Sequence, residues 1–189
     1  MRWTLIVVGL IVTLVLLVAV VAAIGAMLQK GHVAARHVRF TQPPERVFAI
    51  MSDFAQTHTW RKDVTRVEML PAQDGHIMFR EHGQDPVTYR VEAIEPPRRM
   101  VVRIADTNLP YGGAWIYDVT PTSDGGSEVT ITERGEVYNP IFRFMSRFVM
   151  SQHATIDAYL GALGTKLGES VTPAPATAAP APVAASATP

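Results

Sequence analysis

ITERGEVYNPIFRF, residues 131–144, contains the change from a β-strand to an α-helix that indicates the class of fold. Up to Tyr138, polar and apolar residues alternate with period two, as in a strand with one buried face. Asn139-Pro140 is then a capping residue followed by proline at the first helical position. Apolar residues recur at helical spacing from there to Leu167, which predicts one long amphipathic helix.

One carboxylate lies on the apolar side of this predicted strand. The alternation places Glu133 with Val129 and Ile131. If that side borders a cavity, Glu133 is a ligand-orienting residue or a general base, because desolvation raises the pKa of a carboxyl group. Two structural interpretations compete: a buried salt bridge, with Arg143 the nearest arginine in sequence, or a β-bulge before Gly135 that turns the side chain outward. Glu133 is therefore our one candidate catalytic residue.

Residues 31–170 predict a single α+β domain with seven antiparallel strands. Period-two segments are separated by turn residues such as Asp74-Gly75, and connections of this length join antiparallel neighbours. Two short helices are expected between the first two strands, the first opened by Pro43-Pro44. A curved sheet that wraps the long terminal helix buries the apolar faces of both. The predicted strands are residues 32–40, 64–70, 76–82, 86–94, 98–105, 113–120 and 127–138.

Residues 1–30 predict a transmembrane anchor. No charged residue occurs between Trp3 and Leu28, and a helix of that length exceeds the roughly 30 Å hydrocarbon core of a bilayer. A cleaved secretory signal is the alternative, but this apolar run is longer than the roughly 7 to 15 residues of a signal core. We therefore expect a single-pass membrane protein, with the basic residues after the span favouring a cytoplasmic domain.

Composition limits the partners of the remaining chain. Residues 171–189 are mainly Ala, Pro and Thr and are expected to form a disordered tail, because little apolar surface is available to offset the entropy of ordering. The domain carries 15 Lys and Arg against 17 Asp and Glu, which argues against a nucleic-acid partner. The chain has no cysteine, which excludes disulfides and thiolate chemistry.

The order of elements from His32 to Leu167 resembles the START and Bet v 1-like superfamily, in particular its polyketide cyclase/dehydrase-type branch. The resemblance rests on PPERVFAIMSDFAQTHTWRKDV, residues 43–64, and on ITERGEVYNPIFRFMSRF, which leads into the terminal helix. It implies a helix-grip fold with a deep, largely apolar cavity between sheet and helix. It also implies binding of a lipid or other hydrophobic small molecule, and in some relatives cyclisation or dehydration of a polyketide.

Aromatic residues of the strands and helices are the expected lining of this cavity. Trp and Tyr combine an apolar body with one polar group, which suits a pocket for a mostly apolar ligand. Packing in a filled core would explain each aromatic residue singly, and the resemblance favours the pocket. The predicted ligand-binding residues are Trp60, Tyr89, Trp115, Tyr117, Glu133, Phe144 and Phe148.

The sequence offers little support for other chemistry. No histidine pair has the helical spacing of a metal site, and no nucleophile elbow, Walker loop or dinucleotide fingerprint occurs. We therefore expect no metal and no cofactor, and we favour binding over catalysis. The function predicted is membrane-anchored binding of a hydrophobic small molecule or lipid. The alternatives are a cyclase or dehydratase that uses Glu133 with a Tyr or His, and an interaction module whose tail reaches a partner.

Overall fold

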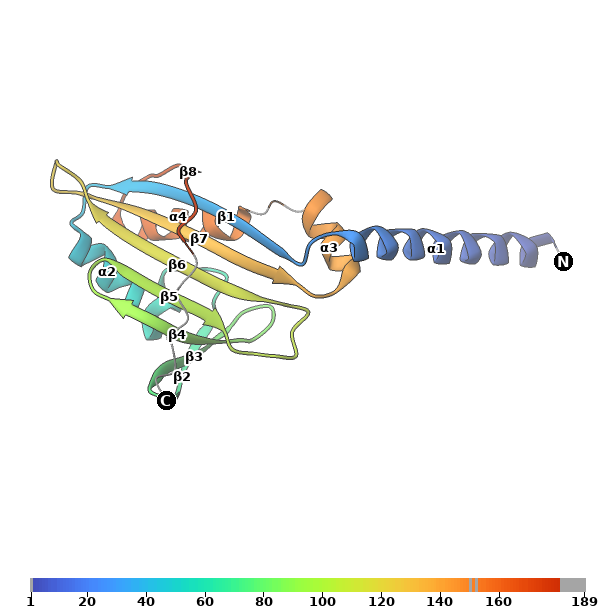
Figure 1. Cartoon of the computed structure of the whole chain (residues 1–189), viewed down its shortest axis with the longest axis horizontal. Helices are drawn as coiled ribbons and strands as arrows, with labels where there is room; N and C mark the ends of the chain where they lie inside the picture. Colours follow the sequence, from blue (N-terminus) through green and yellow to red (C-terminus); the bar gives the residue numbers. More distant parts are fainter. Residues whose placement is uncertain (1, 150, 152, 181–189) are drawn as a thin grey trace.

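The computed structural model describes residues 2–149, 151 and 153–180, which form an α+β domain preceded by a long helix (Figure 1). The helices are α1 (Arg2–Met27), α2 (Pro44–Ser52), the 3-10 helix η1 (Phe54–Thr59), α3 (Pro140–Phe148) and α4 (Ala154–Leu167). The strands are β1 (Gly31–Phe40), β2 (Arg66–Gln73), β3 (His76–His82), β4 (Val87–Glu95), β5 (Arg99–Ile104), β6 (Tyr111–Pro121), β7 (Ser127–Val137) and β8 (Ala174–Pro175).

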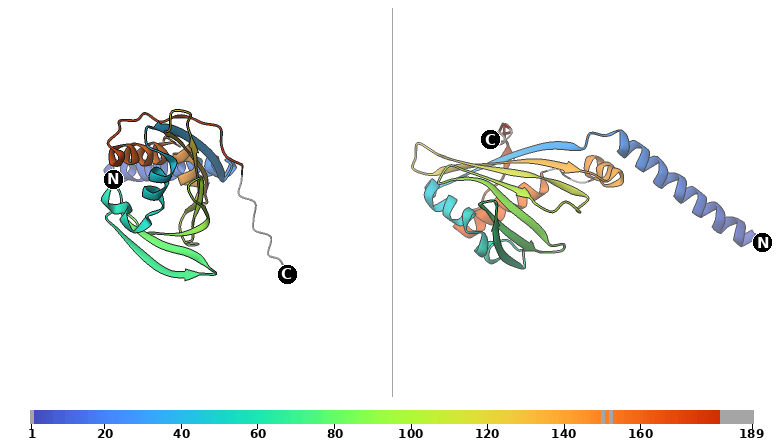
Figure 2. Two further views of the ribbon diagram at one scale, coloured as in Figure 1. Left: turned by 90° about the vertical axis from the view of Figure 1, so that its left-hand side faces the viewer. Right: turned by 60° about the horizontal axis from the view of Figure 1, so that its bottom comes forward.

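The strands form one antiparallel sheet in the order β2-β3-β4-β5-β6-β7-β1-β8. All seven predicted strands are confirmed, and β8 makes eight. The sheet curves around α4, as Figure 2 shows, so the helix-grip fold is also confirmed. The first strand of the domain pairs with the last long one, with Gly31 opposite Glu136 and Phe40 opposite Ser127. This pairing brings the end of α1 next to the junction between β7 and α3.

The core lies between the concave face of the sheet and the inner face of α4. Apolar residues of α4 recur three or four positions apart, which places them on one side of the helix. α2 closes one end of this core, and its proline-opened first turn begins at Pro44. The most deeply buried members are Val47, Phe48, Met51, Met100, Val119, Val129, Ile131, Ile156, Leu160 and Leu163.

The terminal helix is divided, which corrects the prediction of one continuous helix. Asn139 caps α3 as expected, because its Oδ1 accepts hydrogen bonds from the backbone N–H groups of Ile141 and Phe142. α3 nevertheless ends at Phe148, and α4 begins at Ala154. α3 lies beside α1, whereas α4 lies against the sheet, so the two helices pack on different partners.

α1 extends away from the domain along the longest axis of the molecule (Figure 1). Its stretch Trp3–Met27 is long and apolar enough to cross a membrane. Large apolar side chains along its whole length are exposed, from Trp3 at 80% to Met27 at 89%. A helix of this composition is either a membrane span or a signal sequence.

The chain after α4 returns along the outer edge of β1. The expected disorder therefore differs from the structure for residues 171–180, while residues 181–189 lie outside the described part. Ala176 N–H donates to the carbonyl oxygen of Ala35 at 3.2 Å, and Arg36 Nη2 donates to the carbonyl oxygen of Pro173 at 3.0 Å. An edge strand leaves backbone groups without partners, and the bond from Ala176 satisfies one of them on β1. Proline is tolerated on such an edge.

Candidate functional site

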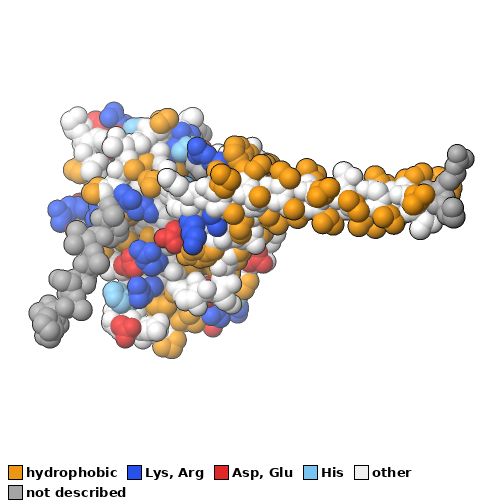
Figure 3. Space-filling view, turned by 45° about the vertical axis from the view of Figure 1, so that its right-hand side comes forward, with side chains coloured by type: hydrophobic (Ala, Val, Ile, Leu, Met, Phe, Trp, Pro, Cys, Tyr) orange, Lys and Arg blue, Asp and Glu red, His pale blue; other side chains and the backbone are white. Residues whose placement is uncertain are grey.

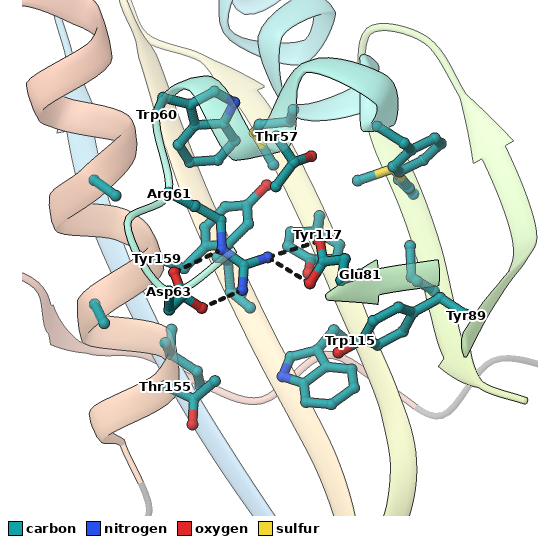
Figure 4. A pocket seen from close by; sticks show the side chains of 18 of the residues that line it. Thr57, Trp60, Arg61, Asp63, Glu81, Tyr89, Trp115, Tyr117, Thr155 and Tyr159 are labelled. Atoms are coloured by element: carbon teal, nitrogen blue, oxygen red, sulfur yellow. Dashed lines mark hydrogen bonds and ion pairs between the residues drawn. The ribbon is translucent and has the colours of Figure 1, made fainter. Parts of the chain in front are cut away.

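A cavity of about 560 Å³ lies between the sheet and α4. This volume is within the roughly 300–1,000 Å³ of small-molecule pockets. Its walls come from four places: the concave face of strands β3 to β7, the inner face of α4, the helices α2 and η1, and the segment after η1 (Figure 4). The sheet contributes Phe79, Glu81, Tyr89, Met100, Val102, Trp115, Tyr117 and Ile131, and α4 contributes Thr155, Ile156, Ala158, Tyr159, Ala162 and Thr165.

Aromatic rings in contact with one another cover much of this wall. On one side Tyr89 stacks on Phe79, with ring centroids 5.3 Å apart, and meets the edge of Trp115 at 6.1 Å. On the other side Tyr159 of α4 lies 5.2 Å from Trp60 and 5.4 Å from Tyr117. Such pairs stabilise one another beyond the area that they bury. The result is a rigid, mostly apolar surface that carries tyrosine hydroxyls.

The guanidinium group of Arg61 lies against this aromatic surface. Arg61 Nη1 donates to both carboxylate oxygens of Glu81, at 3.0 and 3.1 Å. Arg61 Nη2 donates to Asp63 Oδ2 at 2.5 Å, and the guanidinium carbon lies 5.5 Å from the centroid of the Tyr159 ring. Figure 4 shows Arg61 between the two acids. Glu81 lies inside the cavity and Asp63 is exposed, so Arg61 connects a buried carboxylate to one at the surface.

Burial and Arg61 act differently on the two carboxyl groups. Burial raises the pKa of Glu81 above its ordinary value of 4.5, and the charge of Arg61 only partly opposes this effect. Burial also acts to raise the pKa of Asp63, but the hydrogen bond from Arg61 and its charge outweigh burial and lower it. Arg61 itself stays charged: burial would lower its pKa, but the hydrogen bond to Asp63 and the charge of Glu81 raise it overall.

The cavity also offers uncharged polar groups. Burial raises the pKa of Tyr89, Tyr117 and Tyr159 well above 10.0, so their hydroxyls stay protonated and can donate hydrogen bonds. Trp60 Nε1 is buried and has no hydrogen-bond partner among the described residues. A buried donor without a partner is costly. A ligand that brings an acceptor to this wall would therefore be favoured.

Four of the seven predicted residues, Trp60, Tyr89, Trp115 and Tyr117, lie together in the cavity wall. Their role in ligand binding stays a prediction. Phe144 and Phe148 are not brought to the cavity and contact each other on α3, with ring centroids 4.9 Å apart. The reason is the division of the terminal helix, which turns this apolar side of α3 away from the sheet.

Glu133 does lie on the concave face, as its alternation predicts, but beyond the residues that line the cavity. Its Oε2 accepts a 3.2 Å hydrogen bond from Trp115 Nε1, and its Oε1 lies 3.4 Å from His32 Nε2. The proposed partner Arg143 instead donates to two backbone carbonyl groups. β7 pairs with both neighbours in continuous register past Gly135, so the bulge is also absent from this strand.

Sequence reasoning missed Arg61, Asp63, Glu81 and Tyr159 as site residues. A signal for Glu81 was present, because alternation in β3 places it on the same face as Phe79. Arg61 directly follows Trp60, which was identified. Nothing local indicates that Arg61 and Glu81 meet, since 20 positions separate them.

Among the described residues, no group of three or more His, Asp and Glu side chains could hold a metal ion. The polar groups of the described cavity wall are Arg61, its two carboxylate partners, Lys62, and the hydroxyl and indole donors.

Comparisons with solved structures agree with this architecture. The chain is similar in fold to a START superfamily protein from Mycobacterium smegmatis, with 14% identity, a TM-score of 0.57, and coverage of 72% of this chain and 97% of that one. It is similar to the Zhui aromatase/cyclase from Streptomyces sp. R1128, with 13% identity, a TM-score of 0.61, and coverage of 73% and 94%. A hypothetical protein from Helicobacter pylori has 12% identity, a TM-score of 0.60, and coverage of 73% and 88%.

The sequence comparisons identify the family. No curated protein sequence matches the chain significantly. The family described as polyketide cyclase / dehydrase and lipid transport matches residues 32–168, which include every strand from β2 to β7 and both helices α3 and α4. The chain therefore belongs to this family, and its fold is similar to that of the START superfamily protein.

Proposed function

We propose that the chain binds a hydrophobic small molecule or lipid in the cavity between the sheet and α4, and that α1 holds it at a membrane. The observation that carries this proposal is the wall itself: an aromatic surface around about 560 Å³, interrupted by one ion-paired arginine. Pockets of this kind use apolar area for affinity and a few polar groups for orientation. The family description, which includes lipid transport, supports the same class of ligand.

The polar groups restrict the ligand further. The Tyr117 and Tyr159 hydroxyls and the Arg61 guanidinium are all hydrogen-bond donors. A ligand that presents an oxygen acceptor, such as a carbonyl group or a phenolate, would match them. The stacked rings of Phe79 and Tyr89, with Trp115 edge-on beside them, favour flat apolar groups. The ligand class proposed is therefore a mostly apolar molecule, ring-containing or acyl, with at least one oxygen acceptor.

The membrane part of the proposal rests on α1. Ligands of this class partition into bilayers, and a tethered binding domain meets them there at high effective concentration. Extraction of membranes with alkaline carbonate would test the tether: the full chain should stay with the pellet. Release into the supernatant would contradict anchoring without affecting the proposal for the cavity.

Ligand binding can be tested on the full chain purified in amphipols. Native mass spectrometry followed by extraction should find a co-purified apolar molecule. Ala162→Trp places an indole in the cavity and should lower the bound ligand at least about tenfold, a change of about 1.4 kcal/mol. Lys166→Trp is the matched control, because Lys166 is exposed on the same helix and does not line the cavity. Equal ligand content in both variants would contradict binding at this site.

A second candidate function is acid–base catalysis of the cyclase or dehydratase type. One observation favours it: Glu81 is a carboxyl group of raised pKa inside the cavity, next to a fixed cation and tyrosine hydroxyls. A general acid or base works best when its pKa approaches the working pH. Glu81 replaces Glu133 as the candidate, since Glu133 does not line the cavity. Glu81→Gln should abolish turnover of an aromatic polyketide-like substrate while the substrate still binds.

A further inference from the structure

α3 presents an apolar side that the rest of the domain does not cover. Phe142, Phe148 and Val149 are 55%, 60% and 63% exposed, and Ile141 and Met145 are 40% and 37% exposed. At about 100° per residue these five positions share one side of the helix. The opposite side carries Arg143, Ser146 and Arg147. α3 is thus a short amphipathic helix whose apolar side points away from the domain.

α3 is fixed next to the end of α1, as Figure 1 shows. At the contact, a Cβ atom on Gly25 would collide with the backbone carbonyl group of Pro140. Arg143 is buried and donates to the carbonyl oxygens of Leu28 and Tyr138, at 3.0 and 2.9 Å. These bonds tie α3 to the point where the apolar helix meets the domain. The exposed side of α3 is therefore continuous with the exposed apolar surface of α1.

Positive charge surrounds the same junction. A second cavity, of about 670 Å³, is lined by five basic residues, Lys30, Arg103, Arg134, Arg143 and Arg147, with Glu136 as the one acid. Arg103 pairs with Glu92 at 2.6 Å, but none of the other four has an ion pair with a carboxylate of the described part of the chain. The Nε atoms of Arg134 and Arg143 are buried there without a hydrogen-bond partner. Figure 3 shows Lys and Arg side chains on the domain surface around the base of α1.

We propose that α3 is an interfacial helix, which seats the domain on the anionic surface of the bilayer that α1 spans. Phe142, Met145 and Phe148 would enter the boundary between headgroups and acyl chains, and Lys30 and Arg147 would lie against lipid phosphates. Amphipathic helices bind membranes through buried apolar area together with attraction to anionic lipids. This inference rests on the membrane anchor of the proposed function.

The charge around α3 favours a bilayer over a second copy of the chain. Two copies that met through this side of α3 would cover its apolar residues but leave the positive charges of Lys30 and Arg147 unpaired, because Arg147 lies on the opposite side of the helix. An anionic headgroup layer has the complementary charge. The bilayer also covers the exposed side chains of α1 and of α3 together, since the two surfaces are continuous.

The absence of native cysteine allows a direct test with single-cysteine variants of the full chain. Each variant would carry an environment-sensitive nitrobenzoxadiazole label in vesicles of phosphatidylcholine and phosphatidylglycerol, and brominated lipids would quench labels that reach the acyl region. Met145→Cys and Phe148→Cys report on the apolar side of α3. Ser146→Cys is the matched control on its opposite side, and it leaves Arg147 in place. Val12→Cys reports on α1, and Ser123→Cys reports on an exposed turn between β6 and β7.

We expect strong quenching at residue 12, clear quenching at residues 145 and 148, and little at residues 146 and 123. If residue 12 is quenched while residues 145 and 148 behave like residue 123, the interfacial helix is overturned and the anchor stands. If residue 12 is not quenched, the anchor fails and the inference with it. Ligand content in the Ala162→Trp comparison does not depend on either result.

Two further outcomes bear on the choice of partner. Quenching at residues 145 and 148 that stays unchanged in vesicles without phosphatidylglycerol would overturn the role of Lys30 and Arg147. Efficient disulfide cross-linking of Met145→Cys chains, without lipid quenching, would assign the surface to a second copy of the chain and overturn the proposal. Weaker insertion without anionic lipid, and no cross-linking, would support it.

Discussion

Arg61 donates to both carboxylate oxygens of Glu81 with a single nitrogen, at 3.0 and 3.1 Å, within a cavity lined by several aromatic rings. The two side chains are only 16% and 11% exposed. A pair in this position is costly to desolvate and is strongly destabilising to break, because the remaining partner keeps an uncompensated charge. The pair also gives the cavity a charged group that is held in one position.

Arg61→Met should therefore destabilise the protein by about 3 kcal/mol, since it leaves Glu81 buried without its cation. Denaturant unfolding of the purified full chain would measure the change. Arg98→Met is the control, because Arg98 is 75% exposed and its ion pair with Glu95 lies on the surface. Surface pairs contribute about 0–1 kcal/mol. A similar loss in both variants would contradict a special role for the buried pair.

Stability should depend on pH through Glu81 and Asp63 in opposite ways. The folded chain holds the Glu81 proton more tightly than the unfolded chain does. The contribution of Glu81 to stability is therefore fully present below pH 4.5 and is lost as the pH rises through the raised pKa. The Asp63 contribution is present above 3.8 and is lost as pH falls through the lowered pKa. Glu81→Gln should remove the loss toward higher pH and leave the loss in acid. The free energy of unfolding should be measured as a function of pH for the native chain and for Glu81→Gln. If the two curves have the same shape, Glu81 is not the group responsible for the loss of stability toward higher pH.

Glu133→Gln should cost about 1 kcal/mol of stability and leave the co-purified ligand unchanged. The reason is that Glu133 accepts the indole N–H of Trp115 and lies beside His32 without lining the cavity. Hydrogen bonds to charged groups contribute about 1.5–3 kcal/mol, and glutamine keeps part of that contact. Thermal melting and native mass spectrometry would measure the two effects. Loss of ligand with unchanged melting would restore Glu133 as a ligand residue.

Gly135→Ala should displace the His32 ring. A Cβ atom at residue 135 would collide with the imidazole, which Gly135 accommodates on the neighbouring strand. Overpacking of this kind costs about 1–3 kcal/mol. The double variant His32→Ala with Gly135→Ala should recover most of the loss, because the ring is then absent. If the double variant is as unstable as the sum of the single ones, the collision is not the cause.

Removal of residues 172–189 should weaken the edge of the sheet at β1. The lost contacts include the Arg36 bond to Pro173 and the Ala179 N–H bond to Thr132 Oγ1, at 3.0 and 2.9 Å. At about 1 kcal/mol for a typical hydrogen bond, we expect a loss of about 1–3 kcal/mol. Hydrogen exchange on the intact chain gives an independent test, since the amides of Ala176 and Ala179 should be protected. Exchange at the rate of an unfolded peptide would support the disordered tail.

The strands could be predicted because their signals are local. Turn residues such as Asp74-Gly75 and the period-two pattern between them depend only on neighbouring positions, and all seven expected strands occur. The inward direction of Glu133 followed from the same alternation. Its partners did not, because His32 lies 101 positions away and reaches Glu133 only through the pairing of β1 with β7.

The terminal helix shows the limit of periodicity. The spacing of apolar residues from Ile141 to Leu167 correctly indicates helix, but it does not say which neighbour covers each apolar face. In the structure α4 buries its face on the sheet, whereas α3 turns its face outward beside α1. Phe144 and Phe148 were therefore placed in the cavity incorrectly.

Short-range patterns were thus enough to identify the antiparallel sheet, the proline-opened helix α2, the apolar helix α1 and the superfamily, because each depends on residues within a few turns or strands of one another. The cavity with its Arg61–Glu81 pair, the partners of Glu133 and the outward side of α3 depended on the folded molecule. These features arise where segments far apart in the chain pack together, and the contacts that satisfy a buried charge or cover an apolar face are set by that packing.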